Sequence, residues 1–112
     1  MYTVVETAPY LAQSERLFSA EEQATIVDTV ATNPRCGVVI PGTGGIRKLR
    51  VAASGRGKRG GARIIYLFGG DAMPVFLLAA FAKSEKSDLS PAERNNLARL
   101  ATELLRTDRR RR

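Results

Sequence analysis

A chain of 112 residues with 44% hydrophobic content suits one domain with a single modest core. Its net charge of +7 and pI near 10.3 predict an acidic partner, such as nucleic acid, an anionic membrane surface or an acidic protein. One cysteine and no histidine exclude a disulfide framework and a Cys/His zinc site within the chain, and we expect no metal and no cofactor.

The first third of the chain predicts a short strand and two helices. The N-terminus lacks the pattern of a signal peptide, and no apolar stretch approaches the roughly 18 residues of a membrane span, so we expect a soluble cytosolic protein. Residues 2–6 alternate as a strand does, and residues 8–18 fit a helix. Ser19 and Glu22 have the spacing of a capping box, which opens a second helix that ends at Asn33-Pro34.

The remaining part predicts three strands and a last helix. Strands are expected at residues 46–52, 63–68 and 74–81, and the last of these is so apolar that both of its faces should be buried. Ser90, Pro91 and Glu93 open a helix that carries one apolar stripe, formed by Leu97, Leu100, Leu104 and Leu105. Segregated helices and hairpin-linked strands predict an α+β domain.

Between the first two of these strands lies GRGKRGG, in which Gly55, Gly57 and Gly60 fit the G-x-G-x-x-G pattern of dinucleotide-binding loops. That pattern binds a pyrophosphate only where the glycines lead from a strand into a helix. Here they lead into a β-branched and aromatic run, so they join strand to strand. We therefore interpret the segment as a basic loop that carries Arg56, Lys58 and Arg59.

The charges are distributed unevenly. Residues 1–28, 29–70 and 71–112 have net charges of −4, +8 and +3, and the middle segment contains no acid. A segment whose charged residues are all basic predicts a binding site for an anion. The closing TDRRRR, residues 107–112, is expected to be a disordered basic tail without a catalytic role.

Strand alternation places Lys48 and Arg50 on one face of the sheet and Arg47 on the other. Arg63 begins the neighbouring strand, and Lys83 and Lys86 follow the apolar strand, so three strands could converge on one cationic groove. RNA backbone is the natural ligand for such a groove, because arginine binds phosphate oxygens with two prongs and lysine supplies a compact charge. The alternative is that these are ordinary polar residues on a solvated sheet face.

Three further side chains have two interpretations each. Tyr66 and Phe81 could stack on a base, although core packing is the better expectation for aromatic residues in strands. Glu85 could act as a base, or it could form a salt bridge to Lys83 or Lys86.

The segments PGTGGIRKLRVA, GKRGGARIIY and FAKSEKSDLS, in this order and followed by the helix after Ser90, resemble the RelE/ParE superfamily of bacterial toxins, and the HigB branch in particular. The resemblance implies a small curved antiparallel sheet with two N-terminal helices and a C-terminal helix, over residues 1–106. The family's basic strand residues match Lys48 and Arg50, the arginine that opens the next strand matches Arg63, and the Gly-Lys motif after the last strand matches Lys83, with Ala82 in place of glycine. The tyrosine of some members falls at about Ser90, so no general base is carried over.

The resemblance implies a toxin of a type II toxin–antitoxin module that cleaves mRNA in the bacterial cytoplasm, without a metal and on the 70S ribosome. Its partners would be a cognate antitoxin, mRNA and the ribosome, with no membrane and with DNA only through the antitoxin. For cleavage with the ribose 2′-OH as nucleophile, Arg50 and Arg63 are the candidates to stabilise the phosphorane. Lys48 and Lys83 are the candidates for proton transfer, because crowded cations favour the uncharged form of a lysine. The expected RNA-contacting residues are Arg47, Arg56, Lys58, Arg59, Tyr66, Phe81 and Lys86.

Two other functions fit the same sequence. A non-catalytic RNA- or ribosome-binding module would show the same basic sheet, and a ParE-like inhibitor of DNA gyrase would share the fold. The placement of basic residues on the central strands favours the nuclease over the gyrase inhibitor.

Overall fold

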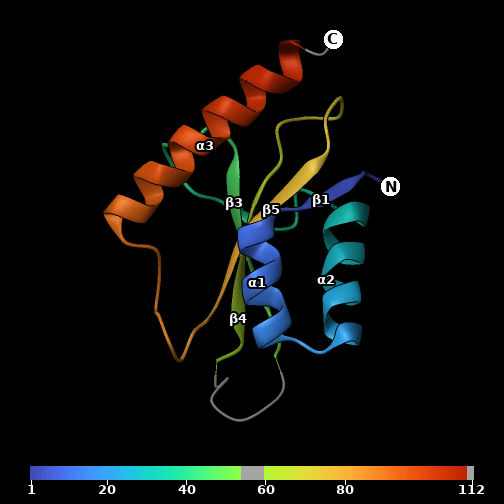
Figure 1. Ribbon diagram of the computed structural model, residues 1–112, viewed down its shortest axis with the longest axis vertical. Coiled ribbons are helices and arrows are strands. Elements are labelled where there is room, and N and C mark those ends of the chain that lie inside the picture. Colours follow the sequence, from blue (N-terminus) through green and yellow to red (C-terminus); the bar gives the residue numbers. More distant parts are fainter. Residues whose placement is uncertain (54–59, 111–112) are drawn as a thin grey trace.

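Three helices and a five-stranded sheet make up the protein, in a computed structural model that describes residues 1–53 and 60–110 (Figure 1). In chain order these are β1 (Val4–Glu6), α1 (Ala8–Leu17), α2 (Ala20–Thr32), β2 (Val38–Val39), β3 (Ile46–Val51), β4 (Ala62–Leu67), β5 (Val75–Ala82) and α3 (Pro91–Arg110). The strand order across the sheet is β1-β5-β4-β3-β2. The predicted α+β class, with two N-terminal helices and one C-terminal helix, is confirmed.

The sheet is mixed rather than wholly antiparallel. Strands β2 to β5 pair antiparallel in sequence order, whereas β1 pairs parallel to β5, with Val4 opposite Val75. A parallel pair needs a long crossover connection, and here the chain between β1 and β5 includes α1, α2 and the other three strands. The two-residue strand β2, which is exposed, was not predicted.

Each face of the sheet is covered by different helices. On one face, α1 and α2 contribute Tyr10, Leu17, Ile26 and Val30 to a cluster with alternate residues of β4 and β5. On the other face, α3 packs its residues Leu97, Ala101, Leu104 and Leu105 against Ile46, Ile65, Leu67 and Leu78. Figure 1 shows α1 and α2 beside each other and α3 running apart from them. Because both faces are covered, β5 is apolar along its whole length, as predicted.

The helices begin where the sequence signals them. Ser19 and Glu22 form the predicted capping box, in which the Ser19 hydroxyl accepts from the Glu22 backbone N–H and the Glu22 carboxylate accepts from Ser19 N–H. Ser90 and Glu93 exchange the same two hydrogen bonds at the start of α3. Each pair satisfies backbone donors that a helix start leaves without a partner.

The C-terminal helix is longer than expected. It extends to Arg110, into the segment 107–112 that was expected to form a basic tail, while residues 111–112 lie outside the described range. Arg109 and Arg110 lie in the last turn, where cations are favoured by the partial negative charge of the helix C-terminus. Leu100, which was assigned to the apolar stripe, is 41% exposed. None of the helices within the described residues has the length and hydropathy needed to cross a membrane.

Candidate functional site

The predicted cations of β3 and β4 meet on one face of the sheet. In the β3–β4 register Arg50 lies opposite Arg63, and Lys48 lies opposite Ile65. Ile65 belongs to the cluster beneath α3, whereas Leu49 packs with the cluster beneath α1 and α2. Lys48, Arg50 and Arg63 therefore share one face of the sheet, as predicted, and this is the face that α3 covers. Arg50 is exposed, and the other two side chains are partly exposed.

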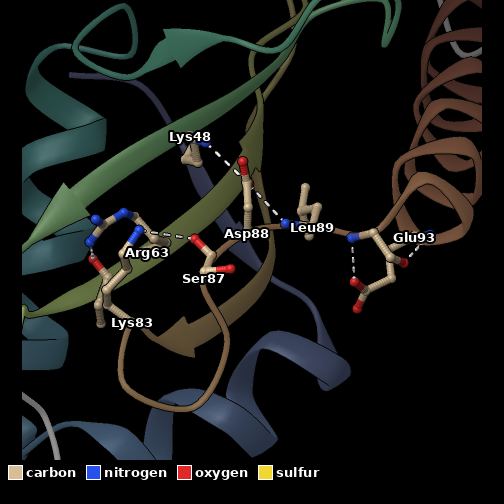
Figure 2. Close-up of polar contacts among 9 residues, drawn as sticks. Lys48, Arg63, Lys83, Ser87, Asp88, Leu89 and Glu93 are labelled. Carbon is tan, nitrogen blue, oxygen red and sulfur yellow. Dashed lines mark hydrogen bonds and ion pairs between the residues drawn. The ribbon is translucent and has the colours of Figure 1, made fainter.

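Lys83 joins this group from the end of β5. Its backbone N–H donates to the Gly61 carbonyl over 3.0 Å, which places it beside the beginning of β4. Its ammonium donates to the Ser87 carbonyl over 3.2 Å. Arg63 bends toward the same corner, where Nη1 donates to the carbonyls of Gly60 and Ala62 over 3.3 and 3.2 Å (Figure 2). We call Lys48, Arg50, Arg63 and Lys83 the basic site.

A hollow of about 280 Å³ opens beside this corner, lined by Arg50, Val51, Ala52, Gly60 and Gly61. Gly60 and Gly61 both have positive φ, of 81° and 74°. A Cβ atom at Gly61 would lie 2.4 Å from the Val51 carbonyl oxygen. Glycine is thus required where β3 and β4 approach each other next to the basic site.

An acid that we did not predict lies within the basic site. The Asp88 carboxylate oxygen Oδ1 accepts from Lys48 Nζ over 3.1 Å and from the Leu89 backbone N–H over 2.8 Å (Figure 2). These two donors lower the pKa of Asp88 below its ordinary value, and the Leu89 backbone N–H has the larger effect. Sequence reasoning named Glu85 as the acid near the lysines, and Asp88 is the acid that contacts one of the candidate catalytic residues.

Glu85 has a different partner from those considered. Its two carboxylate oxygens accept from Arg16 on α1, over 3.0 and 3.2 Å, so the expected salt bridge to Lys83 or Lys86 is wrong. Lys86 instead pairs with Glu93 and lies 5.1 Å from the centre of the Phe81 ring. The Lys86 ammonium lowers the pKa of Glu93, with a smaller contribution from the Ser90 backbone N–H. Within the described residues, no ion pair involves Arg50, Arg63 or Lys83.

Tyr66 does not offer its ring to a ligand. It is fully buried on the α1 and α2 side of the sheet, and its hydroxyl donates to the Pro34 carbonyl and accepts from the Gly37 N–H, both over 2.8 Å. Burial raises the pKa of this phenol to about 12. The suggested base stacking by Tyr66 is therefore contradicted, and the tyrosine holds residues 34–37 against the sheet.

Two other candidates for RNA contact have structural roles. Phe81 is only 7% exposed and packs in the cluster beneath α3, which favours the core interpretation. Arg47, on the opposite face from Lys48, donates to the carbonyls of Arg35 and Gly37 over 3.2 and 2.8 Å. Arg56, Lys58 and Arg59 lie outside the described residues. No group of His, Cys, Asp and Glu in residues 1–53 and 60–110 could hold a metal ion.

Comparison with known proteins identifies the family and the fold. Residues 39–111 match the family described as the RelE toxin of the RelE/RelB toxin–antitoxin system, and this range contains the whole basic site. Among solved structures, the chain is similar to a free-state mutant of the E. coli toxin RelE, with a TM-score of 0.52 and 16% sequence identity over 77% of this chain and 87% of that one. At this identity the structural match supports the fold alone. On the extent of the family match, the chain belongs to the RelE family, whose members are the toxins of toxin–antitoxin systems.

Proposed function

We propose that the chain is an endoribonuclease that cleaves mRNA on the ribosome, without a metal, and so inhibits translation. The observation that carries this proposal is the convergence of Lys48, Arg50, Arg63 and Lys83, from three neighbouring strands, on one side of the sheet. All four side chains are at least partly exposed. Four cations around one corner suit a phosphodiester, whose charge increases in the transition state of cleavage.

In this reaction the RNA supplies both the nucleophile and the leaving group. The ribose 2′-oxygen attacks the adjacent phosphorus, the bond from phosphorus to the 5′-oxygen breaks, and the products are a 2′,3′-cyclic phosphate and a free 5′-hydroxyl. One group accepts the proton of the 2′-OH, and another donates a proton to the leaving 5′-oxygen. The protein must hold these atoms in line and stabilise the phosphorane charge.

We assign the phosphorane charge to Arg50 and Arg63, which lie opposite each other across β3 and β4. Neither guanidinium is paired with a carboxylate in the described part of the chain, so both remain available for phosphate oxygens. Lys48 and Lys83 border them and are the proposed proton-transfer residues. Ser90 does not replace the tyrosine of other members as a base, because its hydroxyl accepts from the Glu93 backbone N–H at the start of α3.

The decisive experiment is translation of a defined mRNA in a purified system, with and without the protein, followed by mapping of new 5′ ends. We expect new ends within the coding region, each with a 5′-hydroxyl, and no such ends when the same mRNA is incubated without ribosomes. Arrested translation without new ends would instead identify a non-catalytic ribosome-binding protein. Normal translation with inhibition of DNA supercoiling would identify a gyrase inhibitor.

We also propose that the chain belongs to the HigB branch and acts in the bacterial cytoplasm. The segments GKRGGARIIY and FAKSEKSDLS support this branch. They contain Arg63 and Lys83 of the basic site, together with Asp88.

A further inference from the structure

Asp88 is the one carboxylate paired with the basic site within the described residues. Its contact with Lys48 joins residues 40 positions apart, and it places a negative charge where an RNA phosphate would otherwise meet that lysine (Figure 2). The side chains of Lys48 and Asp88 are 32% and 48% exposed, so both are accessible to a ligand. An exposed ion pair of this kind contributes little to stability, and a phosphate can therefore replace the carboxylate at low cost.

The surrounding contacts hold Asp88 in this position. The next residue, Leu89, is 7% exposed and packs in the cluster beneath α3. On the other side, the Ser87 carbonyl accepts from Lys83, and Glu85 is bound by Arg16. The carboxylate is thus placed beside Lys48 by an anchored segment, rather than by the chance position of a free side chain.

Proton acceptance is a poor role for this carboxylate. Its Oδ1 atom already accepts two hydrogen bonds, from Lys48 and from the Leu89 backbone. Both donors favour the charged form, and a carboxylate held in that form is a weak base. Asp88 therefore acts through its charge.

We propose that Asp88 is a selectivity residue of the basic site, an internal anion that an RNA phosphate must displace from Lys48. This inference rests on the proposed function, because it takes the basic site to be where RNA binds. An isolated phosphate gains little by displacing Asp88. A strand that also engages Arg50, Arg63 and Lys83 gains enough from these contacts, so the carboxylate disfavours weak, non-productive binding of polyanions.

The test compares Asp88→Asn with the wild-type full-length chain. Asparagine keeps the shape and can still accept from the Leu89 N–H, so only the charge is removed. The matched control is Asp28→Asn, the same change on the exposed surface of α2, which covers the other face of the sheet. The probe is a short 2′-O-methyl RNA, which cannot be cleaved by its own 2′-oxygen, and binding is followed by fluorescence anisotropy over a range of salt concentrations.

We expect Asp88→Asn to bind the probe up to about fivefold more tightly at physiological salt, because the phosphate no longer has to break the exposed Lys48–Asp88 ion pair. The logarithmic salt dependence should become steeper by up to about 0.7, because no displaced carboxylate then takes up a cation to offset the counterion that the RNA releases at Lys48. Asp28→Asn should change neither quantity beyond the small effect of net charge. In a Lys48→Met background, Asp88→Asn should have a clearly smaller effect.

Equal or weaker binding by Asp88→Asn, at an unchanged melting temperature, would overturn the proposal. So would an equal gain in the Asp28→Asn control, or a gain that is undiminished when Lys48 is absent. Failure of the proposed function is distinguishable, because it shows as absence of mRNA cleavage by the wild type. In that case, tighter binding of the probe by Asp88→Asn, with a steeper salt dependence, would still establish Asp88 as the anion that phosphate displaces from this site.

Discussion

Replacing Arg63 by alanine should separate chemistry from fold. The residue lies at the start of β4, opposite Arg50, and its guanidinium contacts only the carbonyls of Gly60 and Ala62 among the polar groups described. If Arg63 binds the scissile phosphate, its loss should lower cleavage by about 10²- to 10³-fold, the usual effect of removing one donor to a developing negative charge. Arg63→Lys should restore little, because a point charge lacks the two-pronged geometry of arginine.

The stability of Arg63→Ala should change little because two effects oppose each other. Two hydrogen bonds are lost, at 3.2 and 3.3 Å, and each is worth about 0.5 to 1 kcal/mol at this partly exposed position. Removal of a like charge opposite Arg50 returns roughly 0.5 to 1 kcal/mol. The net loss is between about 0 and 1.5 kcal/mol, and the melting temperature should fall by no more than about 7 °C.

Three measurements on the same preparations test this reasoning: thermal unfolding by circular dichroism, ribosome co-sedimentation and mRNA cleavage during translation. Arg99→Ala, an exposed arginine on α3, is the matched control for loss of one positive charge. We expect Arg63→Ala to fold and to co-sediment while its cleavage is lost, and Arg99→Ala to cleave normally. Normal cleavage by Arg63→Ala would remove this residue from the site, and its unfolding would show that the arginine serves the fold.

Four further predictions concern Tyr66, Glu93 and the antitoxin. Tyr66→Phe should lower the free energy of unfolding by about 1 to 3 kcal/mol, because the buried Gly37 N–H loses its hydrogen-bond acceptor. Thermal unfolding measures this loss, and an unchanged melting temperature would contradict the prediction. Since the pKa of Tyr66 is raised to about 12, wild-type stability should hold below pH 10 and decline as the pH rises toward 12, and the phenylalanine variant should show a smaller decline. Because Lys86 lowers the pKa of Glu93 below its ordinary 4.5, the stability that this pair contributes should be present above about pH 4.5 and be lost as the pH falls through the lowered pKa. The free energy of unfolding of Glu93→Gln should therefore depend less on pH in acid than that of the wild type. An equal dependence in both proteins would refute the assignment. Finally, expression from the native operon should yield a complex with an antitoxin, whereas full, non-toxic expression of the chain alone would count against such a partner.

Local signals in the sequence predicted most of the fold. The two capping boxes, at Ser19 and Ser90, begin helices where the pattern indicated, because a cap depends only on residues three positions apart. The parallel pairing of β1 with β5 could not be read in this way, since it joins residues about seventy positions apart. The strand β2 is a pair of exposed valines after a glycine, too short to show any alternation.

The basic site was predictable where it depends on strand periodicity. Lys48 and Arg50 share a face because side chains alternate along a strand, and Arg63 joins them once β3 and β4 are adjacent. Alternation also places Tyr66 on the other face from Arg63, because it lies three positions further along the strand, an odd offset. The same alternation that groups the cations on one face therefore contradicts the suggestion that Tyr66 stacks on a base.

The acids after β5 decide which cations of the site stay available, and this depends on irregular structure. Glu85 lies opposite Arg16 because the chain turns there toward α1, and Glu93 reaches Lys86 from the first turn of α3. Asp88, between them, is directed to Lys48 by the burial of Leu89. No sequence spacing predicts these partners, since each depends on where an irregular segment crosses the sheet. The result is a site in which Arg50, Arg63 and Lys83 have no carboxylate partner within the described residues while Lys48 does, so phosphate should engage the first three before it competes for the fourth.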